Sequence, residues 1–327
     1  MTFAKTTRRL ALLSAAFLAG LVACAAPEGE PVAAEAAALA GAPRALAVTR
    51  ILLTNDDGIG APGLQAIYTA VRAIPNTEVK VVAPALNQSG TGSGITSSGA
   101  MTLNQNAPLL NGVDTGVALG GKPADTVRFA LQKVYPPGVK PDLIISGCNS
   151  GQNPGLTFGS GTVGAAQTGA LSGVKSIACS LGTTFQPPAV FGSNLAEYAD
   201  AAAAIRTIVE AIIAGGQSPD PGARQAALAL QRSDMLNVNV PPRNVQGMRL
   251  TRPGAFDVAI NYVTLPDGRI SPQVDLTSLE TFSPAALAQG LETDVGALAA
   301  GFVTVVPWRH ADLSPLRFVD GASALSP

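Results

Sequence analysis

Two adjacent carboxylates, Asp56 and Asp57, directly follow a short apolar run that ends at Thr54. A hard divalent cation takes several oxygen ligands and is favoured by negative charge, which two aspartates at the end of a strand supply. The same Asp-Asp-Gly sequence is also common in turns and helix caps. The motif alone therefore leaves two interpretations open, a metal site and a structural turn.

Two polar loops could add neutral oxygen ligands to the aspartates. Ser89 lies in an Asn-Gln-Ser-Gly loop after the second apolar run, and Asn149 lies in a Gly-Cys-Asn loop after the third. Serine and asparagine also occupy loops for conformational reasons, so each residue alone is weak evidence. Their position after successive predicted strands favours a common site.

A Gly-rich segment, residues 159–166, leads into a predicted helix of small residues. Free N–H groups and the positive end of the helix dipole bind anions at such a helix start, and small side chains let a phosphate approach the backbone. Close packing of a helix on a sheet would also favour Gly and Ala here. Beside a candidate metal site, the segment indicates phosphate chemistry.

The elements that must position these residues alternate between short apolar strands and amphipathic helices. Strands are predicted at 50–54, 79–83, 143–146 and 176–181, and helices begin at Pro62 and Pro123. This alternation predicts an α/β fold with a mostly parallel sheet and helices on both faces. Ligands of such sheets bind beyond the carboxyl ends of the strands, and the candidate residues all fall at that edge.

The second half of the chain predicts a C-terminal extension. A long helix is predicted from Leu195 to Ile212 and a strand at 236–240. Pro266-Asp267-Gly268 lies between two extended segments and predicts a β-hairpin, and a helix at 291–300 leads into a strand at 302–306. The sequence contains no internal repeat.

Composition narrows the class of function. Lys and Arg number 21 against 22 for Asp and Glu, so no basic surface is available to bind a nucleic-acid polymer. His310 is the one histidine, which excludes His-rich zinc sites and favours oxygen ligands and hard cations.

The N-terminus is typical of an export signal. Arg8 and Arg9 precede the apolar stretch 10–22, which is too short to span a bilayer, and Leu-Val-Ala-Cys at 21–24 resembles a lipobox. We therefore expect a signal peptide at 1–23, a lipid on Cys24 and a flexible Ala/Pro-rich tether at 24–48, in a periplasmic or membrane-anchored protein. Ordinary cleavage after small residues would instead release a secreted protein.

Two further cysteines, Cys148 and Cys179, lie within apolar, strand-like segments. They could pair in an oxidising compartment, but small apolar neighbours favour buried free thiols. The sequence therefore predicts no disulfide framework.

Taken together, the motifs resemble those of the SurE family of stationary-phase survival phosphatases. The resemblance covers residues 49–308 and rests on five motifs in the family's order, with similar motifs later at 236–241, 292–294 and 301–307. The five motifs lie at 51–58, 82–90, 121–125, 146–153 and 160–166. Two departures are Gly159, where the family often has Tyr, and Cys148, where it usually has Ile.

What the resemblance implies is a Rossmann-like phosphatase domain at 49–310, followed by a tail at 311–327. Its metal site would hold one divalent ion per subunit, Mg²⁺ or Mn²⁺, on Asp56, Asp57, Ser89 and Asn149. The phosphate pocket would be formed by Asn149, Asn153, Ser160, Gly161 and Thr162, and the catalytic residues would be Asp56, Asp57, Asn153 and Ser160. The C-terminal extension would assemble homodimers or homotetramers.

The implied activity is that of a 5'-nucleotidase and acid phosphatase, which would hydrolyse nucleoside 5'- or 3'-monophosphates, and in several family members short polyphosphate, by attack of metal-activated water. Asp56 or Asp57 would accept the proton of that water, and the sequence does not choose between them. One alternative is a surface lipoprotein that binds nucleotides without cleaving them. Another is a serine hydrolase that uses His310, although no Gly-x-Ser-x-Gly elbow precedes a helix.

Overall fold

The computed structural model describes residues 49–155, 158–184, 190–256, 259–274 and 283–309, all within one compact unit that begins at residue 47. The predicted signal peptide, Cys24, the tether, His310 and the tail at 311–327 lie outside the described residues. No helix in the described ranges is long and apolar enough to cross a membrane.

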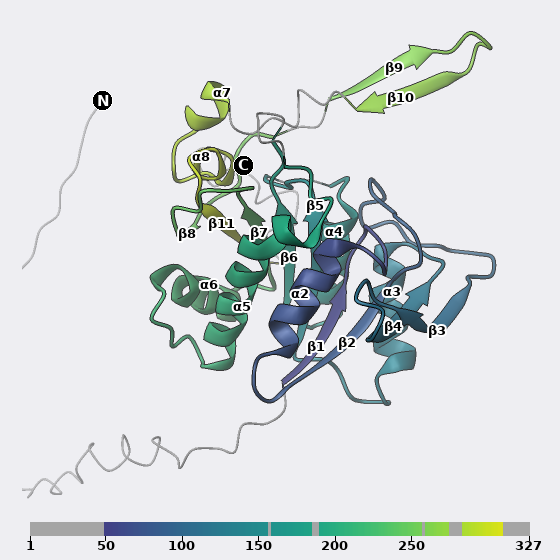
Figure 1. The fold of residues 1–327 in the computed structure, drawn as a ribbon, viewed down its shortest axis with the longest axis horizontal. Coiled ribbons are helices and arrows are strands. Elements are labelled where there is room, and N and C mark those ends of the chain that lie inside the picture. Colours follow the sequence, from purple (N-terminus) through teal and green to yellow (C-terminus); the bar gives the residue numbers. More distant parts are fainter. Residues whose placement is uncertain (1–48, 156–157, 185–189, 257–258, 275–282, 310–327) are drawn as a thin grey trace, which may run out of the picture. The chain divides into compact units, whose positions relative to one another are not determined.

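Strands and helices alternate along the first two thirds of the described chain (Figure 1). The strands are β1 (Thr49–Thr54), β2 (Thr77–Pro84), β3 (Leu103–Pro108), β4 (Thr115–Leu119), β5 (Leu143–Ser150), β6 (Ser176–Leu181), β7 (Met235–Val240), β8 (Met248–Leu250), β9 (Ile260–Thr264), β10 (Ile270–Val274) and β11 (Val303–Trp308). The helices are α2 (Pro62–Arg72), α3 (Pro123–Phe129), the π-helix η1 (Ala130–Val134), α4 (Gly161–Leu171), the 3-10 helix η2 (Leu195–Tyr198), α5 (Ala199–Ile213), α6 (Pro221–Arg232), α7 (Pro284–Leu287) and α8 (Asp294–Ala299).

A nine-stranded sheet forms the centre of the domain, in the order β3-β4-β2-β1-β5-β6-β7-β11-β8. The strands from β4 to β7 are parallel, whereas β3 and β11 run antiparallel to their neighbours β4 and β7. This confirms the predicted mostly parallel α/β fold. The predicted hairpin is also present, as β9 and β10 in a separate two-stranded antiparallel sheet.

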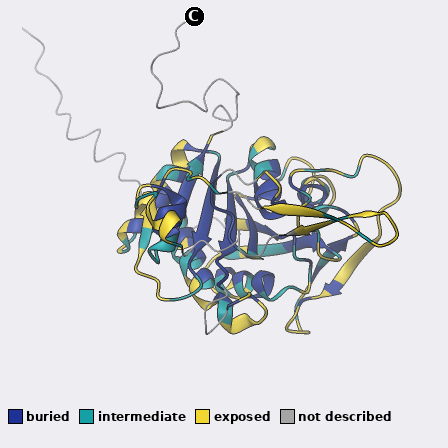
Figure 2. Cartoon of the chain, turned by 90° about the horizontal axis from the view of Figure 1, so that it is seen from above, coloured by how far each residue is buried: buried dark blue, intermediate teal, exposed yellow. Residues whose placement is uncertain are grey.

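Two apolar cores lie on opposite faces of the sheet, so the central strands are dark blue over most of their length in Figure 2. On one face, Leu53 and Ile145 pack with side chains of α2 and α5 such as Ile67 and Ile205. On the other, the alternate residues of the same strands pack with α3 and α4. Continuous burial on both sides explains the unbroken apolar runs of the central strands.

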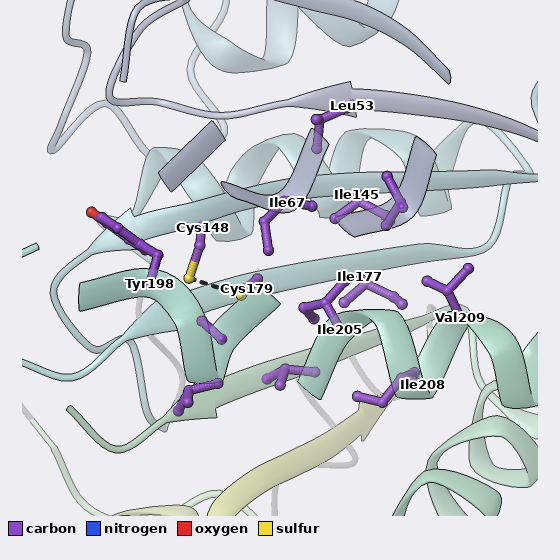
Figure 3. Close-up of a cluster of buried hydrophobic side chains, with 14 of the residues drawn as sticks. Leu53, Ile67, Ile145, Cys148, Ile177, Cys179, Tyr198, Ile205, Ile208 and Val209 are labelled. Atoms are coloured by element: carbon purple, nitrogen blue, oxygen red, sulfur yellow. Dashed lines mark hydrogen bonds between the residues drawn. The ribbon is translucent and has the colours of Figure 1, made fainter. Parts of the chain in front are cut away.

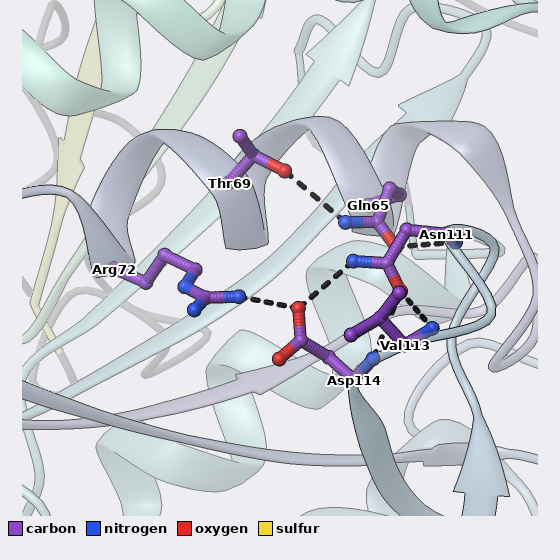
Figure 4. Close-up of polar contacts among 6 residues, drawn as sticks. All are labelled: Gln65, Thr69, Arg72, Asn111, Val113 and Asp114. Atoms are coloured by element: carbon purple, nitrogen blue, oxygen red, sulfur yellow. Dashed lines mark hydrogen bonds and ion pairs between the residues drawn. The ribbon is translucent and has the colours of Figure 1, made fainter.

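Strands β3 and β4 were not predicted from the sequence. The loop between them is attached to α2 by a polar network (Figure 4): Arg72 forms an ion pair with Asp114, Asn111 donates to Asp114 at 2.8 Å, and Gln65 accepts from the Asn111 backbone at 3.2 Å. Strand β3 is exposed along most of its length, so it carries little of the apolar alternation that reveals a strand.

Several predicted elements differ in their bounds by a few residues, among them the helix predicted at 291–300, which is Asp294–Ala299 in the structure. The helix predicted from Leu195 begins as the 3-10 turn η2, and α5 starts at Ala199. The third strand was predicted to break at Gly147, but β5 continues to Ser150. A side chain at position 147 would come within 2.2 Å of the Cys179 carbonyl oxygen, so the glycine permits close pairing rather than ending the strand.

Candidate active site

The Asp-Asp turn is held by the residue before it. Asn55 donates from Nδ2 to the Gly58 carbonyl at 2.9 Å and accepts from the Gly58 N–H at 3.2 Å. Gly58 has a φ of +102°, a conformation that side chains rarely adopt. This closed turn fixes Asp56, which is buried, and Asp57, which is half-buried, at the carboxyl end of β1.

The loop after β2 contacts both aspartates. Gln88 donates its backbone N–H to the Asp56 carbonyl at 2.7 Å, and Asn87 donates from Nδ2 to Asp57 Oδ1 at 3.3 Å. Asn87 also accepts from the backbone N–H of Ser89 at 2.8 Å. These contacts anchor the loop beside the two carboxylates. The predicted ligand Ser89 is exposed on this loop.

The end of β5 brings the third loop to the same place. Ser150 donates its backbone N–H to Asp57 Oδ2 at 3.0 Å. The preceding residue, Asn149, donates from Nδ2 to the Gly151 carbonyl at 2.8 Å, which leaves its amide oxygen as the atom for a cation. The structure thus brings together the segments that carry all four predicted metal ligands.

Helix α4 begins against Asp56. Thr162 donates its hydroxyl to Asp56 Oδ1, and Ser160 caps the helix by accepting from the Val163 N–H at 3.2 Å. Thr162 and Ser160 were predicted to bind phosphate; here their hydroxyls orient a carboxylate and cap a helix, and the backbone N–H groups of Gly161 and Thr162 also face the Asp56 carboxylate. The catalytic role of Ser160 stays a prediction.

Asn153 occupies a different position from the one predicted for a phosphate ligand. Its Nδ2 donates to Ser180 at 2.9 Å, its N–H donates to Asn239 at 2.6 Å, and its carbonyl accepts from Asn237 at 2.7 Å. Asn153 is buried within this network, whose partners lie on β6 and β7. Its evident role is to hold the loop between β5 and α4, and direct contact with phosphate stays a prediction.

Burial and mutual repulsion disfavour the ionised forms of the two aspartates. Burial raises the pKa of Asp56, while burial and then the adjacent Asp56 charge raise the pKa of Asp57 to about 6. Within the described residues neither carboxylate forms a salt bridge, and no third Asp, Glu, His or Cys joins them. A divalent cation on these oxygens would offset the repulsion, and a hydroxyl and an amide oxygen are suitable additional ligands.

Comparison with known proteins decides the family. The family model for survival protein SurE matches residues 51–259. The chain belongs to the SurE family. Family membership also confirms the predicted enzyme class, a phosphoric monoester hydrolase.

Several SurE relatives cover most of the chain. This chain is 34% identical over 278 residues to the 5'-nucleotidase SurE of Desulfitobacterium hafniense, and the alignment covers 81% of this chain and 92% of the relative. It is 35% identical over 269 residues to that of Methanoculleus marisnigri, covering 79% and 90%. The crystal structure of the SurE protein from Aquifex aeolicus matches with a TM-score of 0.60 and 27% identity, covering 83% of this chain and 96% of that one.

A cleft of about 360 Å³ adjoins the SurE site at Asp57, and no residue of α4 is among its lining residues in the described chain. Asp57, Asn87 and Ser150 line it together with apolar residues that include Pro62 and Leu86. Leu86 is 75% exposed, so its side chain is free to contact a bound molecule. A phosphate group at the start of α4 would thus leave space beyond Asp57 for the rest of an ester.

The contact between Gly161 and Asp56 is tight enough to test. A Cβ at position 161 would lie 2.8 Å from Asp56 Cβ, whereas a Cβ at position 159 would meet nothing within 4 Å. We expect Gly161→Ala to displace Asp56 and lower kcat/KM for an aryl phosphate at least about tenfold, because small misplacements of reacting groups are costly. Gly159→Ala is the matched control and should keep near-normal activity. Equal kcat/KM values for the two variants would contradict this packing.

A buried carboxylate far along the chain holds the site loop to the C-terminal extension. Asp294 accepts from the Gly155 N–H and from the Gly254 N–H, each at 2.6 Å. The two glycines also approach each other closely, since a Cβ at Gly155 would lie 2.8 Å from the Gly254 carbonyl oxygen. Burial raises the pKa of Asp294 to about 6 despite these hydrogen bonds.

This pKa predicts a pH dependence of stability. Because the native Asp294 carboxyl binds its proton more tightly than the unfolded chain, raising the pH from about 4 to about 6 should lower the free energy of unfolding by on the order of 2 kcal/mol. Urea unfolding in the presence of a chelator would measure it. Asp294→Asn should make the free energy of unfolding depend less steeply on pH. Some dependence should remain, because groups such as Asp57 titrate in both proteins. Parallel curves for parent and variant would exclude this role.

Sequence reasoning missed several residues that support the site. Asn87 lay within a recognised motif, and Asp294 within the Glu-Thr-Asp sequence that resembled the family's. Asn237 and Asn239 alternate along β7, and polar residues at that period on an otherwise apolar strand were a usable signal of a polar patch on one face. Their partner, the loop at Asn153, was not evident from the pattern.

Proposed function

We propose that this chain is a metal-dependent 5'-nucleotidase that hydrolyses nucleoside monophosphates. The observation that carries the proposal is the pair Asp56 and Asp57, which lack a cationic partner in the described chain and adjoin both the start of α4 and an open cleft. The SurE relatives named 5'-nucleotidase support the substrate class. Activity as a broader acid phosphatase or on polyphosphate belongs to the same proposal.

One group of residues would bind the metal ion, and the start of α4 would contact the phosphate. Asp56, Asp57, Ser89 and Asn149 would hold one divalent ion, Mg²⁺ or Mn²⁺, which supplies Lewis acidity to a phosphoryl oxygen and to water when bound. The start of α4 would face the remaining phosphoryl oxygens, with the N–H groups of Gly161 and Thr162 shared between these oxygens and the Asp56 carboxylate. Thr162 keeps Asp56 in place, and the Ser150 N–H keeps Asp57 in place.

Proton transfer falls to the more accessible aspartate. Asp57 is half-buried and lines the cleft, whereas Asp56 is buried and accepts the Thr162 hydroxyl. A pKa of about 6 suits a group that accepts a proton from water near neutral pH. The nucleoside leaves through the cleft beside Leu86.

A phosphate-release screen of the purified full chain tests this function. We expect release from nucleoside 5'-monophosphates with Mg²⁺ or Mn²⁺ and loss of release with EDTA. Saturable nucleotide binding without phosphate release under every metal would instead favour the binding-protein alternative. Unchanged activity of His310→Ala would remove the serine-hydrolase alternative.

We also propose that the protein is exported and attached to a membrane through a lipid on Cys24. The basic pair at 8–9, the apolar run and the lipobox-like sequence support this. Mass spectrometry of the mature N-terminus gives the answer: a diacylated or triacylated Cys24 is expected, and an unmodified terminus at or after this position would indicate a secreted protein.

The hairpin supports a proposal of assembly into homodimers or homotetramers. One face of the β9–β10 sheet presents Ile260, Tyr262 and Ile270, which are 46%, 71% and 59% exposed. An isolated two-stranded sheet with an exposed apolar face is marginally stable alone. Light scattering should give a mass of two or four chains, and Tyr262→Lys should lower it.

A further inference from the structure

Two thiols meet in the core behind the site. Cys148 on β5 and Cys179 on β6 are free and fully buried, and their Sγ atoms lie 2.9 Å apart (Figure 3). This separation is only about 0.9 Å longer than a disulfide bond. The two sulfur atoms therefore need a small movement to bond.

The fold explains why these residues meet. Strands β5 and β6 are parallel neighbours, and their register shifts between Ser146 and Asn149, which places Cys148 beside Cys179. Both side chains face the core that contains Tyr198. The carbonyl of Cys148 packs so closely on α2 that a Cβ at Gly63 would come within 2.0 Å of it, so the backbone around the first thiol is held firmly.

We propose that Cys148 and Cys179 are the site of an intramolecular structural disulfide. The bond would join the carboxyl ends of β5 and β6, immediately before the predicted metal ligand Asn149 and before Ser180, which accepts from Asn153. The residues are separated by 31 positions, and the closed segment contains Asn153 and all of α4. A cross-link there restricts the unfolded chain over the whole phosphate-binding segment.

The oxidant is a small-molecule or protein disulfide. One cysteine thiolate attacks a sulfur of that disulfide to form a mixed disulfide and releases the first thiolate of the oxidant. The second cysteine thiolate then attacks the protein sulfur, so the protein S–S bond forms and the second thiolate leaves. Two protein thiols are oxidised, one disulfide is reduced, and the two protons pass to the released thiolates.

Oxidation must occur before the sheet closes. Both thiols are fully buried, so a disulfide oxidant cannot reach either of them in the folded protein. During folding the strands are open and the contact forms as β5 pairs with β6. Once made, the bond is shielded from reductant by the same burial.

Refolding of the full chain tests the inference independently of export. The variant Cys24→Ser retains only the two thiols of the proposed bond. It is unfolded with reductant and refolded in a buffer of reduced and oxidised glutathione, and remaining thiols are then blocked under denaturing conditions. Trypsin should yield peptides 134–175 and 176–206 joined by a bond that dithiothreitol breaks. Recovery of both cysteines as blocked thiols, or as separate glutathione adducts, in active protein would overturn the inference.

A thermal measurement provides the second readout. We expect the oxidised Cys24→Ser protein to melt roughly 5–10 °C above its reduced form. The matched control is Cys24→Ser with Cys148→Ala and Cys179→Ala, in which oxidised and reduced glutathione should give the same midpoint. If the double alanine change prevents folding, Cys179→Ser alone serves as control. A parent midpoint that is insensitive to oxidation would contradict a structural role for the bond.

Discussion

Replacing Asp57 with asparagine is expected to lower the rate of phosphate release by roughly two to three orders of magnitude, the loss typical when a charge-stabilising group of an active site is removed. Asparagine has the same shape and can still accept from the Ser150 N–H. The variant therefore removes the negative charge and the proton acceptor while leaving the loop anchored. Initial rates with a nucleoside monophosphate and with an aryl phosphate would measure the effect.

Stability separates this result from misfolding. Because burial and the Asp56 charge raise the pKa of Asp57 to about 6, ionised Asp57 destabilises the metal-free protein at pH 7. Asp57→Asn should therefore be at least as stable as the parent in urea with a chelator. Asp200→Asn, an exposed position on α5, is the matched control and should retain full activity. Turnover of Asp57→Asn within a factor of a few of the parent would remove Asp57 from the mechanism.

Removal of divalent metal should abolish activity and also lower the stability of the parent protein. An ion that binds only the native state adds about 2.7 kcal/mol to the free energy of unfolding at a concentration of 100 times its Kd. We therefore expect Mn²⁺ or Mg²⁺ to raise the thermal midpoint after EDTA treatment. Because the ion would offset the repulsion between Asp56 and Asp57, the gain depends on both carboxylates.

The control for the metal experiment is Asp57→Asn, which should show little or no thermal shift with the same ions. Calorimetric titration of the metal-free parent should give one ion per chain. A parent that keeps full activity through extensive chelation, or that binds no ion, would be inconsistent with the proposed metal site.

The sequence predicted the central sheet and the place of the site well. The runs at Ile51–Thr54 and Leu143–Ser146 are buried on both faces, so their uninterrupted apolar character revealed strands without tertiary information. Parallel strands must end at one edge, and this geometric rule brought the loops of Ser89 and Asn149 to the aspartates. The motifs alone could not show that Thr162 bonds to Asp56.

What the sequence could not predict depends on pairing across long separations. Asn153 and Asn239 are 86 positions apart, and Gly155 and Asp294 are 139 apart. Their partners are backbone groups, which carry no residue type to recognise. The contact between Cys148 and Cys179 depends on a register shift that neither strand reveals by itself.

The carboxylate of Asp294 binds two segments at once, the loop before α4 and the segment that leads to the hairpin. If one of these hydrogen bonds breaks, the buried carboxylate loses a donor. The free energy that holds the other segment in place is then smaller. The two backbone segments should therefore unfold locally together, as one cooperative unit. In native-state hydrogen exchange, the amides of Gly155 and Gly254 would then report the same opening free energy, although almost a hundred residues separate them along the chain.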